Sequence, residues 1–166
     1  MNGGVKLTLL IGPVPIPAPQ PVVEALSAVK VEAGSGETVL MLHGFWDSWL
    51  HERDVLLARG TEHPTDDDAT GYAAAYGVFI AAAVASMFGD QVQDKLTLGG
   101  DGGGVFDLDT HGDVTLTVTP ATAAGPPAAE VADALAGRAQ TAAVLGGLPA
   151  SSRAALSRLA DFFNTP

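Results

Sequence analysis

The chain has no cysteine, few basic residues and few aromatic ones. Without cysteine there is no disulfide framework, thiolate nucleophile or cysteine-bound zinc, so the composition neither requires nor excludes an oxidising compartment. The chain carries 8 basic and 19 acidic residues, which gives it a net charge of −11. Because this charge repels phosphate backbones and anionic lipid surfaces, we expect no nucleic acid partner.

Small side chains are abundant where large ones are scarce. Aromatic residues make up 6% of the 166 residues, against 20 glycines and 11 prolines. A core of small side chains brings backbones close together, and such surfaces also suit contacts between chains. We therefore expect protein partners or self-association, a single domain, and a cytoplasmic or particle-associated location, since the N-terminus lacks the pattern of a signal peptide.

Alternation and turn residues predict a small mixed sheet packed by helices, which is an α/β fold. The predicted strands are residues 5–11, 29–32, 38–42, 95–98 and 114–118. The predicted helices are residues 21–29, 47–57, 71–89, 128–145 and 151–163, with Gly60 ending the second. We divide the chain into a strand and proline-rich arm (1–21), an α/β core (22–120), and a linker with a C-terminal helical pair (121–166).

The helix predicted at residues 71–89 contains no charged residue. Its length fits a membrane span of about 20 residues, yet alanine and glycine supply little transfer energy and no Lys or Arg is placed to anchor its ends. A buried central helix, or a small-residue contact with another chain, is the interpretation we favour, and we do not expect a membrane partner.

A second informative stretch runs through Val39, Leu40, Met41 and Leu42 into His43 and Gly44. The apolar run reads as a buried strand that ends at His43-Gly44, before a helix that carries Trp49. This stretch resembles the α/β-hydrolase fold, in its epoxide hydrolase and haloalkane dehalogenase branch.

The hydrolase resemblance implies three catalytic residues. Asp101, set between glycines, matches the nucleophile on its strand-to-helix elbow, while Phe45 and Gly102 would offer backbone N–H groups to an oxyanion. The chain departs from the family because too little sequence follows Asp101 to supply an acid and a base, and His111 follows it too closely. Enzymatic activity therefore stays the alternative interpretation.

The acidic stretch around Asp101, Asp107, Asp109 and Asp113 has offsets found in calcium loops. It lacks the bidentate Glu, since Val118 stands at that position, so an acidic β-turn is the favoured interpretation. For the four histidines we expect exposed or hydrogen-bonded side chains and no ligand set. We thus expect no metal and no cofactor.

Residues 5–38 open with VKLTLLIGPVPIPAP and continue through VVEALSAVKVEAGSGET. This strand, proline-alternating arm and second strand resemble the N-terminus of actinobacterial baseplate-hub proteins related to phage late control protein D, which occur in phage-tail-like contractile injection particles. The resemblance ends where the hydrolase-like stretch begins, so the sequence reads as a mosaic. It implies a non-enzymatic structural or assembly component, with the α/β-hydrolase as the alternative.

Overall fold

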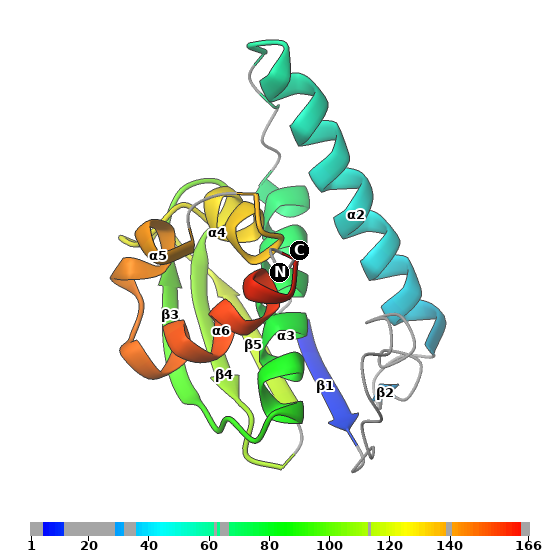
Figure 1. Ribbon diagram of the computed structural model, residues 1–166, viewed down its shortest axis with the longest axis vertical. Coiled ribbons are helices and arrows are strands. Elements are labelled where there is room, and N and C mark those ends of the chain that lie inside the picture. The colour runs from blue at the N-terminus through cyan, green and yellow to red at the C-terminus, as the bar shows by residue number, and fades with distance from the viewer. Residues whose placement is uncertain are drawn as a thin grey trace.

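A computed structural model describes residues 5–11, 29–31, 36–61, 63, 67–112, 114–138 and 141–163. They form one α/β domain in which helices pack on a sheet, as predicted (Figure 1). The strands are β1 Val5–Ile11, β2 Val29–Val31, β3 Gln93–Leu98, β4 Gly104–Asp109 and β5 Val114–Pro120. The helices are α2 Gly36–Ala58, α3 Asp67–Met87, α4 Ala128–Leu135, α5 Thr141–Val144, the 3₁₀ turn η1 Leu145–Gly147, and α6 Ala150–Phe163.

The sheet has the order β2-β1-β5-β4-β3, and each of these four pairings is antiparallel, where the sequence had suggested a mixture of directions. Strands β3, β4 and β5 form a meander, and β1 pairs with the free edge of β5. Alternate side chains of the meander are fully buried, which gives the sheet one apolar face. These side chains are Leu96, Leu98, Phe106, Leu108, Val114 and Leu116.

Two strand predictions need correction. Residues 38–42, predicted as a strand, lie inside α2. A short apolar run fits a buried helix as well as a buried strand, and Gly44 continues the helix where a turn was expected. Strand β4 was not predicted, because Asp107 and Asp109 made the segment look like an acidic loop. In the fold Asp107 is exposed, while Phe106 and Leu108 are buried.

The helix predicted at residues 128–145 is also shorter than expected. Helix α4 ends at Leu135, and Gly137 follows with a φ of 73°. The N–H of Arg138 donates to the carbonyl of Asp133 at 2.8 Å, which is the closing bond of a Schellman end. The predicted proline-rich arm and residues 21–28 of the predicted helix fall outside the described residues, and Val29 lies in β2.

Helix α3 lies in the middle of the molecule, between α2 and the sheet with its C-terminal helices (Figure 1). All eleven residues from 73 to 83 are buried, so the expectation of a buried central helix is confirmed. The helix is long and apolar enough to cross a membrane by length and composition, and 72% of that window is buried inside the fold. Gly77 faces both α2 and α4, because a Cβ there would lie 3.4 Å from Trp46 and from Leu135, which is close van der Waals contact.

Helix α2 packs on this core through its middle and projects beyond it at its C-terminal end (Figure 1). Trp46, Trp49 and Leu50 are buried. The Arg53 Nε atom donates to Asp133 Oδ2 of α4 at 2.7 Å, and the Arg53 guanidinium lies 5.3 Å from the Trp49 ring centre. The helix ends at Ala58, and Gly60 follows on its C-terminal side as predicted, with a φ of 68°.

Candidate functional site

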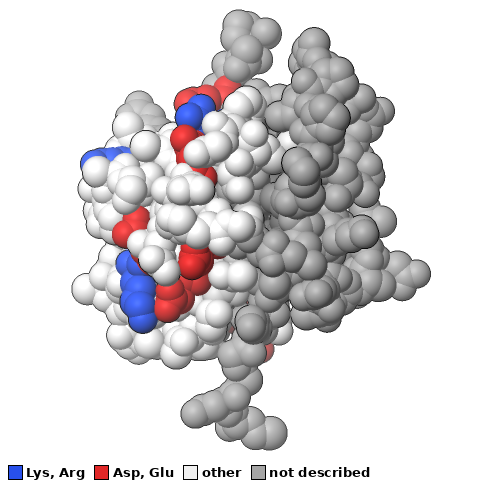
Figure 2. All heavy atoms as spheres, turned by 90° about the horizontal axis from the view of Figure 1, so that it is seen from below, with Lys and Arg blue, Asp and Glu red and all other residues white. Residues whose placement is uncertain are grey.

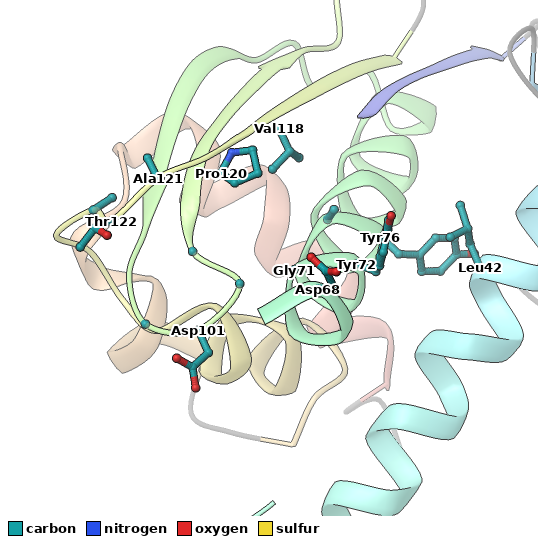
Figure 3. Close-up of a pocket in the computed structure, with 15 residues that line it drawn as sticks. Leu42, Asp68, Gly71, Tyr72, Tyr76, Asp101, Val118, Pro120, Ala121 and Thr122 are labelled. Atoms are coloured by element: carbon teal, nitrogen blue, oxygen red, sulfur yellow. The ribbon is translucent and has the colours of Figure 1, made fainter. Parts of the chain in front are cut away.

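A cavity of about 720 Å³ opens beside the N-terminal half of α3 (Figure 3). One wall comes from α3 and α2, the other from the end of β5 and the segment after it, and the turn between β3 and β4 lies at the end of the cavity. The described residues that line it are Leu42, Asp68, Gly71, Tyr72, Ala75, Tyr76, Gly100, Asp101, Gly102, Gly103, Val118, Pro120, Ala121, Thr122 and Ala123.

The β3–β4 turn is held against α3 by a contact that only glycine allows. Gly102 has a φ of 69°, and a Cβ on it would lie 2.2 Å from the backbone nitrogen of Gly71. Within the turn, the Gly103 N–H donates to the Gly100 carbonyl at 3.0 Å. This close backbone approach fixes the end of the cavity.

Two tyrosines four residues apart form the aromatic part of the α3 wall. Tyr72 is 47% exposed, and the Phe45 ring meets it edge to face at a centroid distance of 6.5 Å. Tyr76 is buried, and its hydroxyl is hydrogen-bonded to Nδ1 of His43 at 3.2 Å. Burial raises the pKa of Tyr76, so its hydroxyl stays neutral. The wall therefore has an accessible ring backed by a fixed one.

The cavity is acidic. Asp68 and Asp101 line it, and its described lining contains no Lys, Arg or His. Four described basic side chains elsewhere pair with carboxylates, and Figure 2 shows blue and red atoms side by side on one face. These ion pairs are Arg53 with Asp133, Arg138 with Asp54, Arg158 with Asp90, and Lys95 with Asp107.

The structure keeps two of the three residues implied by the hydrolase resemblance together and places the third, Phe45, on a different element. Asp101 and Gly102 lie in a strand-to-strand turn, whereas the family needs a strand-to-helix elbow. Phe45 lies inside α2, where a backbone N–H is used by the carbonyl four residues earlier. The expected role of Phe45 as an oxyanion donor is therefore wrong, because the strand that should have ended before it is a helix.

No histidine lies among the described residues that line the cavity with Asp101. His111 lies beyond the opposite end of β4. Because each strand residue adds about 3.3 Å, the six residues of β4 put roughly 20 Å between the two turns. His111 instead holds Oδ1 of Asp109 through its backbone N–H at 2.8 Å and its Nδ1 at 3.0 Å.

The remaining histidines agree with expectation in part. His43 is hydrogen-bonded, and His51 is exposed near Asp47. His63 is buried, its ring meets Trp49 at 5.3 Å, and its nitrogens have no hydrogen bond among the described residues. The expectation of an exposed or hydrogen-bonded side chain is wrong there, since Trp49 and Glu52 of α2 lie against the ring, with Nε2 3.7 Å from the Glu52 carboxylate.

The calcium-loop alternative does not match the described part of the structure. Asp107 and Asp109 lie on β4 rather than on a loop, and Asp107 pairs with Nζ of Lys95 at 3.1 Å. Asp101 lies at the other end of that strand, and Asp113 falls outside the described residues. Among the described residues, no three His, Asp or Glu side chains are grouped so that they could hold a metal ion.

Sequence reasoning found Asp101 and Gly102 but missed the surface they join. Tyr72 and Tyr76 share one face of a helix by their spacing, but nothing in the sequence brings the glycine turn and the Val118 end of β5 to that face.

No protein family, curated protein or solved structure matches the chain.

Proposed function

We propose that this protein is a non-enzymatic assembly component that binds other proteins, as part of the baseplate of a phage-tail-like particle. The particle is suggested by the resemblance of residues 5–38 to baseplate-hub proteins. The binding role is supported by the projecting end of α2, and this is the observation on which the proposal depends.

The projecting end of α2 exposes large apolar side chains. Val55 is 52% exposed and Leu57 is 51% exposed, on a helix end that extends past the rest of the fold (Figure 1). The two side chains are separated by about 200° around the helix, so apolar surface faces outward on both sides. Exposed apolar groups on a protruding element favour contact with a partner.

The chemistry of the described residues gives the enzyme alternative less support. Asp101 has an accessible position in a cavity, but none of the described residues that line this cavity is a histidine that could act as its base. A nucleophile needs a base within hydrogen-bond reach and donors for the oxyanion. The assembly role requires neither, so it is the function that the geometry supports best.

The test is the mass of the protein in solution, alone and with candidate partners. Light scattering during gel filtration should show self-association at high concentration, or a complex with a tail-tube, sheath or baseplate protein encoded beside this gene. The double variant V55E/L57E should weaken that association about tenfold or more, because charge replaces apolar surface in the contact.

A matched control for the single variants Val55→Glu and Leu57→Glu is Phe163→Glu, which places the same one added charge at an apolar residue 48% exposed on α6. It should leave association unchanged. A protein that stays monomeric at high concentration and binds none of these partners contradicts the proposal. Equal loss in F163E and in either single α2 variant would show that net charge, rather than the end of α2, controls association.

A further inference from the structure

The cavity between α3 and the end of β5 has aromatic and apolar walls. Tyr72 is 47% exposed in its lining, and the Phe45 ring, 38% exposed, meets Tyr72 edge to face. Apolar side chains beside and opposite Tyr72 belong to Leu42, Ala75, Val118 and Pro120. Figure 3 shows the Asp101 carboxylate pointing away from the tyrosines, and Asp68 and Asp101 each have an interaction within the protein. The cavity therefore suits an uncharged, apolar ligand better than an ion.

The chain itself contains a segment of matching chemistry. From Pro13 to Pro21 every second residue is proline, and residues 12–23 include no charged side chain. Such a sequence favours the extended polyproline II helix, which leaves its backbone polar groups solvated. Grooves lined by aromatic rings bind segments of this kind, because the rings pack on proline and the segment loses little entropy on binding.

The proline spacing gives this segment two apolar edges in polyproline geometry. Three residues complete one turn of that helix, so residues three apart share an edge. The three edges are Pro13, Ile16 and Pro19; Pro15, Ala18 and Pro21; and Val14, Pro17 and Gln20. Only the third edge includes a polar side chain. The segment can thus pack against two apolar walls while Gln20 faces water.

The sheet separates the start of this segment from the cavity of its own chain. Val5 pairs with Val118 at the cavity, whereas Ile11 pairs with Val29 at the other end of β1. The six steps from Val5 to Ile11 span about 20 Å at roughly 3.3 Å each. Pro13 follows Ile11 by two residues, which reach about 7 Å at most. The first prolines therefore cannot reach the cavity of the same chain, whereas a second copy can present the whole segment.

We propose that the cavity docks the proline-rich segment, residues 12–21, of a second copy of this chain. The proline rings pack on Tyr72 and Phe45 and against the Val118 wall. The cavity volume of about 720 Å³ is in the range of ligand pockets, and the contact of Gly102 with Gly71 fixes its end before binding. Two copies that dock each other's segments form a closed symmetric dimer. The choice of a second copy rests on the proposed assembly function.

The first experiment is an NMR titration of the ¹⁵N-labelled full chain, at a concentration where it is monomeric. The ligand is the peptide of residues 12–21, acetyl-Gly-Pro-Val-Pro-Ile-Pro-Ala-Pro-Gln-Pro-amide. We expect shifts at the amides of Tyr72, Ala75, Val118 and Ala121. The same peptide with alanine at every proline should cause none. Shifts elsewhere, no shifts, or equal binding of the alanine peptide would overturn the proposal.

Tyr72→Ala should weaken peptide binding about three- to tenfold, because it removes the exposed ring. The matched control is Phe88→Ala, which removes another exposed aromatic ring, just past the far end of α3 and outside the cavity lining. It should leave binding unchanged, and equal weakening by both variants would overturn the proposal. Circular dichroism verifies that each variant is folded.

The second experiment measures self-association of the full chain by light scattering. The triple variant P15A/P17A/P19A and Tyr72→Ala should each weaken it about threefold or more. Self-association that neither variant changes would show that a second copy does not supply the segment, and would overturn the proposal.

The two experiments separate this proposal from the proposed function. Association that V55E/L57E weakens, without peptide binding, would overturn the docking site and leave the assembly function standing. Peptide binding by a protein that associates neither with itself nor with the candidate partners would contradict the assembly function, and would overturn the second copy as the source of the segment.

Discussion

Replacement of Arg53 by alanine should destabilise the protein far more than the same replacement of Arg138. Both arginines join α2 to the region of α4, with Nε atoms 2.7 Å from Asp133 and 2.8 Å from Asp54 respectively. They differ in burial. The Arg53 and Asp133 side chains are each 13% exposed, whereas those of Arg138 and Asp54 are 27% and 47% exposed.

The magnitude follows from what each variant leaves behind. Arg53→Ala strands the Asp133 carboxylate in a mostly buried position, and breaking a buried pair in this way costs about 3 kcal/mol or more. It also removes the guanidinium from the Trp49 ring, at about 0.5–1 kcal/mol. Arg138→Ala breaks an exposed pair, worth about 0–1 kcal/mol. Urea unfolding followed by tryptophan fluorescence measures both, since Trp46 and Trp49 are buried in the folded state.

The stability lost in Arg53→Ala, measured as the free energy of unfolding, should also depend on pH. Burial raises the pKa of Asp133 above its ordinary value of 3.8, although Arg53 opposes this shift. A carboxyl whose folded pKa is raised stabilises the fold below its unfolded pKa, and that contribution is lost as pH rises through the folded pKa. Without Arg53 the pKa rises further, so the deficit of the variant should be small below about pH 4 and grow toward neutrality.

Two results would refute this reasoning. Equal destabilisation by Arg53→Ala and Arg138→Ala would show that burial does not control the value of these pairs. A deficit in Arg53→Ala that is the same at acid and neutral pH would show that lost packing, and not the stranded carboxylate, causes it.

Two further predictions concern the β3–β4 turn. Gly102→Ala should lower the melting temperature more than Gly112→Ala. Both glycines have a positive φ, which costs about 1–2 kcal/mol for an L residue. Of the two, only Gly102 has backbone atoms within 4 Å of where a Cβ would lie. Equal shifts would mean that the contact with Gly71 is relaxed in solution. Esters, epoxides and haloalkanes should show no turnover that Asp101→Ala abolishes, and Asp101-dependent turnover would restore the hydrolase alternative.

The strands and helices that the sequence predicts well are those with a clear pattern or an end signal within their own residues. The strand predicted at residues 114–118 alternates, and the helix α2 ends where Gly60 can adopt a positive φ. The run from Val39 to His43 is not bounded by such a residue. Its apolar pattern fits a buried strand and a buried helix equally, and in the fold it is part of helix α2. Strand β4 was missed for a different reason, because its exposed acidic residues are typical of a loop.

The glycines around Asp101 indicate a special backbone geometry, but the sequence alone could not show what requires that geometry. Glycines flank a catalytic nucleophile because its backbone is strained and must approach a neighbouring helix closely. Here Gly102 does approach a helix closely, yet that helix is α3, which precedes the turn in the chain and meets it at Gly71. The glycines therefore do mark a close approach of two backbones, and a nucleophile does not follow from such an approach. A local pattern states that backbones must meet, while the tertiary fold decides which element is met and which side chains share the space between them.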